Sequence, residues 1–85
     1  MANKSVQIDW TEGVEMKSIA MLIQKASAFS SMIHIVKDGR KANAKSLLGM
    51  MSLGIEDGSA IEILADGPDA DEAVEAIADF LQNPA

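Results

Sequence analysis

The hydroxyl group best placed for chemistry in this chain belongs to Ser46. It stands directly before an apolar run made up of Leu47, Leu48, Met50, Met51 and Leu53. Serine is a good N-cap, so we expect Ser46 to begin a helix of about two turns over 47–53, with Gly54 where a C-terminal glycine belongs. A phosphate on this hydroxyl would lie where the helix dipole favours negative charge.

The apolar run after Ser46 cannot be buried completely. A two-turn helix hides only one face, so some of its leucine and methionine side chains must stay exposed and form a small patch beside the serine. Methionine suits an adaptable protein-binding surface. The pattern therefore indicates two compatible roles for Ser46, as a helix cap and as a hydroxyl group beside a docking patch.

A second group of polar residues lies near the start of a predicted helix. The chain there reads Gly13-Val14-Glu15-Met16-Lys17-Ser18-Ile19-Ala20. A helix start offers unpaired N–H groups and the positive end of the dipole, so it attracts anions. A carboxylate at this place stabilises a helix by about 0.3–1 kcal/mol. A carboxylate can also form an acyl phosphate, so Glu15 has both a structural and a chemical interpretation.

One histidine and no cysteine limit the other chemistry open to the chain. The absence of cysteine excludes a disulfide framework and a thiolate metal site, and a single histidine excludes a histidine cluster. We therefore expect no metal site and no cofactor. His34 falls within a predicted strand, where a lone histidine is usually just packed or exposed.

The charge balance is acidic. The net charge is −6 and the sequence pI is about 4.5. Nucleic-acid binding needs a basic face, so the composition argues against that class and suits docking to a basic protein partner. No run approaches the roughly 20 apolar residues of a membrane span, and the first residues lack the apolar run of a signal peptide. We expect a cytoplasmic protein with no membrane or nucleic-acid partner.

The elements that must position these residues can be predicted from periodicity. Alternating apolar residues indicate a strand over 4–10, and helical spacing indicates an amphipathic helix over 16–29. A β-branched strand follows over 32–37. Asp38-Gly39 is a strong hairpin signal and predicts a return strand from Arg40 to Ala44.

The second half continues the alternation of helix and strand. After the helix over 47–53, residues 60–65 indicate a fourth strand. Asp69 and Glu72 have capping-box spacing before a closing helix over 70–82. The order βαββαβα predicts one domain over 1–85 with an α+β, open-faced sandwich fold, in which a mostly antiparallel four-stranded sheet carries its helices on one face.

The segment Gly39-Arg-Lys-Ala-Asn-Ala-Lys-Ser-Leu-Leu-Gly-Met-Met-Ser-Leu-Gly54 resembles the regulatory-serine signature of the HPr family, the histidine-containing phosphocarriers of the bacterial sugar phosphotransferase system. The order of elements also resembles the HPr fold, so the resemblance covers the whole chain. Family members carry a phosphoacceptor histidine in a Gly-(Ile/Leu)-His-Ala-Arg-Pro-Ala context. In this chain Glu15 stands in place of that histidine, Lys17 in place of the arginine and Ser18 in place of the proline.

The resemblance implies specific roles for the serine site. In the family this serine is phosphorylated by HPr kinase/phosphorylase, which implies regulatory phosphorylation of Ser46. The apolar patch is implied to dock on that kinase, on a catabolite-control transcription regulator or on enzyme I. The contacts that we expect are Leu47, Leu48 and Met51, with Lys45 supporting the phosphate; Asn43 and Lys41 are weaker candidates.

The leading hypothesis is a regulatory binding protein of carbon catabolite control that catalyses nothing itself. In this respect the chain is similar to HPr-like catabolite-repression proteins that lack the histidine. Glu15 then either caps the helix or imitates phosphohistidine. The alternatives are a phosphocarrier that uses Glu15 or His34 as an atypical acceptor, and a constitutive mimic of phosphorylated HPr.

Overall fold

The computed structural model describes the backbone of residues 1–8, 15–54 and 58–82, and the side chains of these residues except 15–17. Within these ranges the elements are β1 (Ala2–Gln7), α1 (Glu15–Ser27), β2 (Met32–Lys37), β3 (Arg40–Asn43), α2 (Leu47–Leu53), β4 (Ala60–Asp66) and α3 (Ala70–Gln82). The predicted order βαββαβα is confirmed. The strands form one antiparallel sheet in the order β1-β4-β2-β3.

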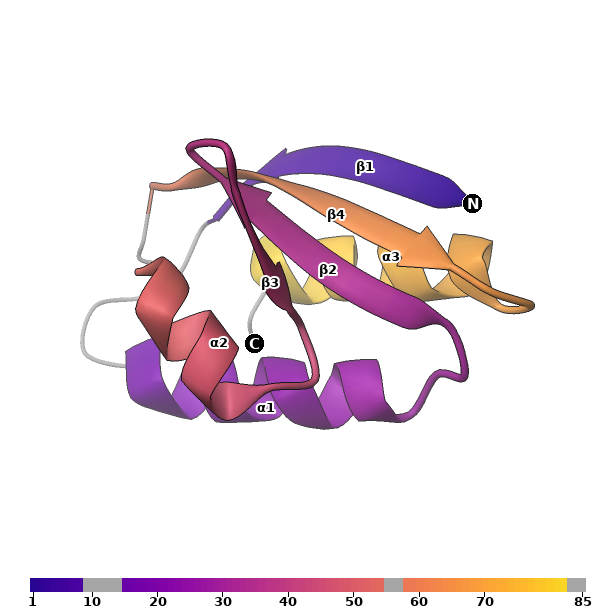
Figure 1. Ribbon diagram of the computed structural model, residues 1–85, viewed down its shortest axis with the longest axis horizontal. Coiled ribbons are helices and arrows are strands. Elements are labelled where there is room, and N and C mark those ends of the chain that lie inside the picture. The colour runs from indigo at the N-terminus through magenta and orange to yellow at the C-terminus, as the bar shows by residue number, and fades with distance from the viewer. Residues whose placement is uncertain (9–14, 55–57, 83–85) are drawn as a thin grey trace.

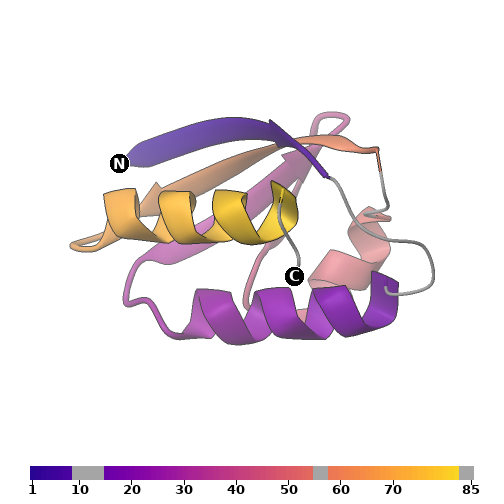
Figure 2. The same cartoon turned by 180° about the vertical axis from the view of Figure 1, so that it is seen from behind.

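The three helices lie on one face of this sheet (Figures 1 and 2). α1 and α3 run side by side beneath it, and α2 lies beside α1 under β3, at the edge of the sheet. None of the helices in the described ranges lies on the other face. The predicted open-faced α+β sandwich is therefore confirmed.

The period-two pattern of the strands decides which face is buried. In β2 and β4 the pairs Ile33–Ala65 and Ile35–Ile63 stand opposite each other, and all four side chains are buried towards the helices. Intervening residues of these strands, such as His34, lie on the open face and are only half-buried. One face thus forms the floor of the core while the other is left to solvent.

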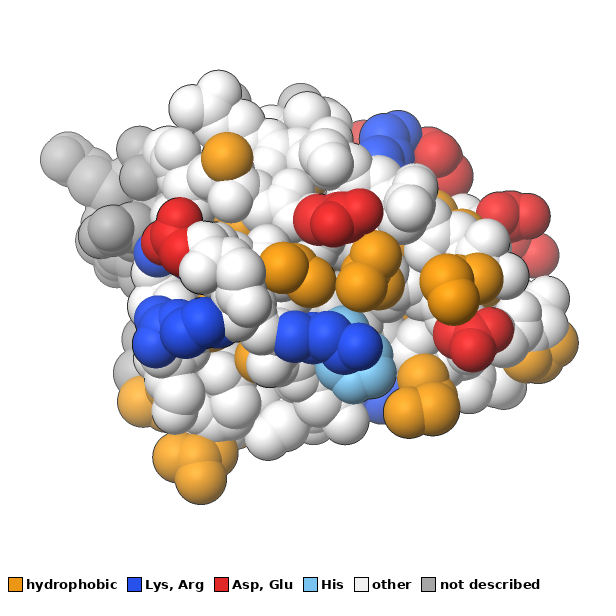
Figure 3. All heavy atoms as spheres, turned by 45° about the horizontal axis from the view of Figure 1, so that its top comes forward, with side chains coloured by type: hydrophobic (Ala, Val, Ile, Leu, Met, Phe, Trp, Pro, Cys, Tyr) orange, Lys and Arg blue, Asp and Glu red, His pale blue; other side chains and the backbone are white. Residues whose placement is uncertain are grey.

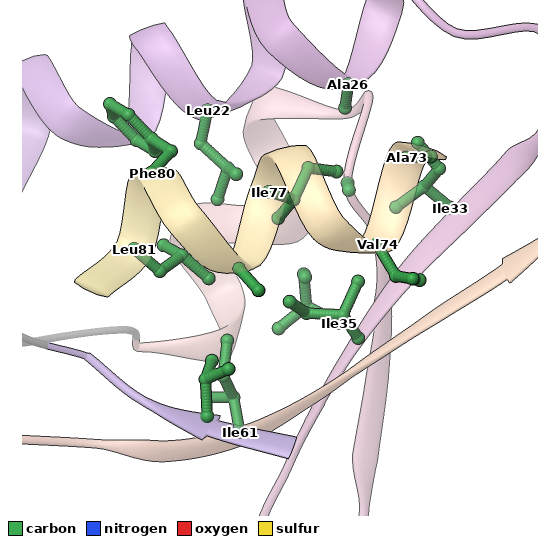
Figure 4. Close-up of a cluster of buried hydrophobic side chains, with 14 of the residues drawn as sticks. Leu22, Ala26, Ile33, Ile35, Ile61, Ala73, Val74, Ile77, Phe80 and Leu81 are labelled. Carbon is green, nitrogen blue, oxygen red and sulfur yellow. The ribbon is translucent and has the colours of Figure 1, made fainter. Parts of the chain in front are cut away.

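The core is filled by aliphatic side chains from the helices (Figure 4). Ile77 and Leu81 of α3 are fully buried, as are Leu22 and Ala26 of α1. Small residues at Ala73 and Ala78 bring α3 close to its neighbours, as efficient packing in a chain of 85 residues requires. The single core holds the two long helices and the sheet in register, which gives the short helix α2 a fixed place.

The turn between β2 and β3 follows the prediction. Asp38 and Gly39 both have positive φ, 52° and 76°, as a two-residue hairpin turn requires. Lys37 and Arg40 pair across this turn. The return strand ends at Asn43, one residue earlier than predicted.

The first strand and the first helix differ from their predicted bounds by a few residues. The first strand begins at Ala2 and ends at Gln7, because its polar start still pairs with β4 and the backbone of Ile8 bonds to the loop residues Ser59 and Gly58 instead. Its predicted end over 9–10 lies outside the described residues. The first helix ends at Ser27, where i to i+3 bonds from the N–H groups of Ala28 and Phe29 tighten the chain into a turn.

Asp69 stands directly before α3, in the predicted cap position, and its backbone oxygen accepts from Ala73 N at 2.9 Å, but its carboxylate bonds outside the helix. The carboxylate of Asp69 accepts hydrogen bonds from the backbone N–H groups of Ser30 and Ser31, each at 2.9 Å, and from the Ser31 hydroxyl. It therefore ties the start of α3 to the loop that follows α1. The carboxylate that the local spacing assigned to α3 thus forms a tertiary contact instead.

Candidate functional site

Ser46 caps α2 as the sequence predicts. Its backbone is extended, with φ −110° and ψ 116°, and its Oγ accepts a hydrogen bond from Gly49 N at 3.2 Å. Gly54 closes the helix in the left-handed conformation, with φ 74°. The hydroxyl oxygen of Ser46 therefore lies at the positive end of a helix whose first turn contains no acidic residue.

Asn43 shapes the approach to Ser46. Its Oδ1 accepts from Lys45 N at 2.8 Å, and its backbone oxygen accepts from Ser46 N at 3.0 Å. An asparagine that bonds to the backbone two residues on forms a turn without any further partner. Asn43 thus acts through the backbone, because it turns the chain from β3 into the cap of α2.

The leucine and methionine side chains of α2 divide between core and surface. Met50 is fully buried and Leu53 nearly so. Leu47, Leu48 and Met51 are 49%, 77% and 46% exposed, and these three residues are called the α2 patch below. The three contact residues expected from the sequence all lie on the surface, next to the Ser46 cap.

Three basic side chains hold helix ends around this site. Lys37 Nζ donates to the carbonyl of Gly54, and Arg40 Nη2 donates to the carbonyl of Leu53 at 3.3 Å. Lys45 Nζ donates to the carbonyl of Phe29 at 2.8 Å, just beyond the end of α1. Cations at a helix C-terminus satisfy carbonyls and oppose the dipole. The hairpin thereby stabilises the end of α2, which has no basic residue in its own last turn.

These capping contacts were not predicted. Lys37 and Arg40 flank the hairpin turn, and no local signal pairs a hairpin with a helix more than ten residues later. Lys45 was assigned to the phosphate of Ser46, whereas the structure places its ammonium on the carbonyl of Phe29. Its assignment to the phosphate stays a prediction.

Glu15 is the first residue of α1, which fits its predicted place at a helix start. The side chains of Glu15 and Lys17 lie outside the described residues. Ser18 follows them and is buried, with 5% of its surface exposed. α1 lies beside α2 in both ribbon views, so the two predicted sites belong to neighbouring helices (Figures 1 and 2).

His34 lies away from both helices. It sits in β2, opposite Asn43 and Leu64, on the face of the sheet that carries no helix. It is the one pale-blue side chain in Figure 3 and lies between basic and hydrophobic side chains. His34 therefore shares no surface with the α2 patch, since the sheet separates them.

The described residues support neither a metal site nor a membrane-spanning helix. Over 1–8, 15–54 and 58–82, no three His, Cys, Asp or Glu residues come together in a way that could hold a metal ion. None of the helices in these ranges is long and apolar enough to cross a membrane.

Comparison with known proteins agrees with this geometry. The family model described as "PTS HPr component phosphorylation site" matches residues 2–83. The chain is 42% identical over 82 residues to the HPr-like protein Crh of Halalkalibacterium halodurans, covering 96% of this chain and 98% of that protein. It is 35% identical to the HPr-like protein Crh of Bacillus subtilis, with 96% of each chain covered.

Solved structures give the same result. The phosphocarrier protein HPr from Bacillus anthracis superposes with a TM-score of 0.90 at 43% identity, covering 95% of this chain and 96% of that one. A crystal structure of Bacillus subtilis Crh, described as a swapped dimer, gives a TM-score of 0.74 at 34% identity over 95% and 93% of the two chains. Sequence and fold agree, and the chain belongs to the HPr family.

Proposed function

We propose that this chain is a regulatory HPr-like protein of carbon catabolite control, switched by phosphorylation of Ser46. The observation that carries the proposal is the placement of the Ser46 hydroxyl at the cap of α2, directly beside the exposed α2 patch. The curated relatives named Crh support it, since one solved relative is described as a catabolite repression protein. The chain acts as the substrate of a kinase and catalyses no reaction itself.

The physical effect of the switch is local. A phosphate adds about −1.5 to −2 charges at neutral pH and three acceptor oxygens. At Ser46 these oxygens can take over the hydrogen bond from Gly49 N, so the cap is kept while the surface changes. The phosphorylated protein therefore keeps its fold and presents a new anion next to apolar side chains.

The α2 patch supplies the rest of the docking surface. Exposed leucine and methionine side chains offer apolar area to a partner, and the phosphate adds a charge that a basic partner can read. We assign this surface to HPr kinase/phosphorylase, to a catabolite-control transcription regulator and to enzyme I. Lys45 is next to Ser46 in the chain and can contact the phosphate if its ammonium leaves the carbonyl of Phe29.

Glu15 gives the other half of the proposal. A carboxylate at the first residue of α1 stabilises the helix but lacks the nucleophilic imidazole of a carrier. Lys17 also lacks the planar fork with which arginine clamps phosphate oxygens. We assign Glu15 to capping of α1, without a role in phosphate transfer.

The test is intact-protein and peptide mass spectrometry of two parallel reactions. One contains HPr kinase/phosphorylase with ATP, and the other contains enzyme I with phosphoenolpyruvate. We expect phosphate on Ser46 in the first reaction and none in the second. Phosphate from phosphoenolpyruvate on Glu15 or His34 would overturn the proposal and make the chain a carrier.

A matched variant shows whether the hydroxyl itself is modified. Asparagine is as good an N-cap as serine but has no hydroxyl, so Ser46→Asn keeps α2 intact and removes the acceptor. Ser52→Ala removes a different exposed hydroxyl from the same helix. Phosphorylation by the kinase should vanish in Ser46→Asn and persist in Ser52→Ala. If neither wild type nor Ser52→Ala is phosphorylated, the role of Ser46 is that of a helix cap only.

A further inference from the structure

The edge strand β3 has backbone groups that point away from the sheet. Among the described strands β3 pairs with β2 alone, and Ala44 N donates to Ile33 O at 2.9 Å at the end of this ladder. In an antiparallel ladder, paired and outward-facing residues alternate. Counting back from Ala44, the backbone N–H and C=O of Lys41 and the N–H of Asn43 face outward. The Asn43 carbonyl is already used by Ser46 N.

A groove of about 350 Å³ runs along this edge, between β3 and α2. One side consists of β3 itself. The other side is the face of α2 that carries Ser46, Gly49 and Ser52 at helical spacing, with Leu53 at the end. A Cβ on Gly49 would lie 3.7 Å from the Cβ of Ala42, at ordinary contact distance, so α2 packs against β3 at this point. The small residues Ser46, Gly49 and Ser52 line the groove without filling it.

The charge of this edge is opposite to that of the whole chain. Four of the seven basic residues, at positions 37, 40, 41 and 45, fall within nine residues of a chain whose net charge is −6. Arg40 and Lys41 line the groove, and both are exposed. Among the described side chains the ion pair is Lys4–Glu75, at the β1 edge, and none of these side chains forms an ion pair with Arg40 or Lys41.

The outward backbone groups and the positive charge of β3 indicate which kind of chain can bind in the groove. A second copy pairing through β3 would place Arg40 and Lys41 against the same cations, and lysine on an edge strand opposes such pairing. An acidic strand avoids this repulsion, because its carboxylates pair with the cations of Arg40 and Lys41. Its backbone can also form hydrogen bonds with the outward N–H groups of Lys41 and Asn43 and with the outward carbonyl of Lys41. Main-chain pairing gives affinity in such strand addition, and alternate side chains give specificity.

We propose that the groove between β3 and α2 binds an acidic, extended segment of a partner protein, which adds to the sheet as a fifth strand beside β3. The groove is distinct from the α2 patch, since it contains none of the patch residues Leu47, Leu48 and Met51. The chain therefore has two docking surfaces on opposite sides of α2. Ser46 lines one end of the groove, so a negative charge there repels an acidic occupant.

The experiment is a titration of the isotope-labelled full chain, followed by amide NMR shifts. The probe is a blocked synthetic peptide of about six residues, a typical strand length, in which pairs of glutamates alternate with pairs of threonines, so that carboxylates project from both faces of the strand. A peptide of the same length with lysine in place of glutamate is the control. We expect the acidic peptide to shift the amides of Lys41, Asn43 and Gly49, and the lysine peptide to leave them unchanged.

Variants locate the binding. Lys41→Gln should weaken the acidic peptide about two- to fivefold, the effect of one exposed ion pair, whereas Lys25→Gln on α1 removes an equal charge and should leave binding unchanged. Ser46→Asp keeps a good N-cap and should weaken binding by a similar factor. Equal effects of Lys41→Gln and Lys25→Gln, shifts confined to β1, equal binding of both peptides, or no binding would each overturn the proposal.

Discussion

Asp69 Oδ1 lies 2.9 Å from the backbone nitrogen of Ser31, and this contact joins the loop before α3 to the loop after α1. Asp69 Oδ2 accepts from Ser30 N at the same distance, and the Ser31 hydroxyl donates to the carboxylate. Ser31 is 1% exposed. Its backbone also lies close to Gly67, so two crossovers of the fold are fastened at one end of the molecule (Figure 1).

The first prediction concerns acid stability. Hydrogen bonds from the Ser31 side chain and from the Ser30 backbone lower the pKa of Asp69 below its ordinary value. A lowered pKa in the folded state means that the unfolded chain binds the proton more tightly, so stability from this group is present above about pH 4 and is lost as pH falls through the folded pKa. Urea unfolding of wild type should show this loss.

Asp69→Asn provides the comparison. The amide cannot titrate, so the stability of this variant should be lower at neutral pH and should fall less steeply between about pH 4 and pH 2. Asp71→Asn removes another carboxylate from the first turn of α3 and serves as the control. Parallel acid limbs for wild type and Asp69→Asn would show that the contact with Ser31 does not shift the titration.

The second prediction concerns Gly67. A Cβ added to Gly67 would lie 2.7 Å from the Cα of Ser31, and the residue has φ +153°. Gly67→Ala should therefore destabilise the protein by about 2–4 kcal/mol, since both the backbone and the contact must adjust. Gly39→Ala is a control at φ +76° with open space around it, and should cost only about 1–2 kcal/mol. Equal losses in denaturant unfolding would show that contact with Ser31 is not the cause.

Features with a local cause could be predicted from the sequence. Ser46 and Gly54 were assigned to the two ends of α2, and Asp38-Gly39 to a hairpin, because each depends on backbone chemistry within a few residues. The positions of exposed apolar residues on α2 likewise follow from the fact that a short helix buries one face. The order of elements predicted the open-faced sandwich, and the resemblance of that order to the HPr fold supported the same prediction.

Contacts between distant segments could not be predicted in this way. Asp69 matched a capping pattern with Glu72, but its carboxylate contacts a loop 38 residues earlier in the chain, where two N–H groups and a hydroxyl converge. Lys37 and Arg40 satisfy carbonyls at the end of α2 for a similar reason, since only the folded sheet brings the hairpin there. Such a side chain bonds to whichever donor or acceptor the folded chain brings closest. The sequence around the side chain does not show which distant groups those are.

The third prediction concerns the cap of α2. Ser46→Ala removes the acceptor of the Gly49 N–H and should destabilise the protein by about 0.5–2 kcal/mol. Ser46→Asp should restore this stability, because its carboxylate accepts the same bond at a helix start. Thermal unfolding of both variants beside wild type measures the effect. Equal stability of the alanine variant and wild type would mean that the cap contributes nothing.

The fourth prediction separates docking from folding on α2. Leu48 is 77% exposed, so Leu48→Ser should change stability by no more than about 0.5 kcal/mol. If the α2 patch docks on HPr kinase/phosphorylase, the same change should slow phosphorylation of Ser46 at least severalfold. Met50 is fully buried, so Met50→Ala should instead cost about 2–5 kcal/mol. Unaltered phosphorylation of Leu48→Ser would remove this residue from the docking surface.

The last prediction tests whether this chain differs from a phosphocarrier only at the start of α1. An imidazole at a helix start can accept a phosphoryl group, and a neighbouring arginine can clamp its oxygens bidentately. The double variant Glu15→His, Lys17→Arg should therefore accept phosphate from phosphoenolpyruvate and enzyme I, while wild type does not. Glu15→Gln with Lys17→Arg is the control without an imidazole. Transfer to the histidine variant alone would show that enzyme I still recognises the surrounding surface. Lack of transfer to all three proteins would show that docking has also diverged.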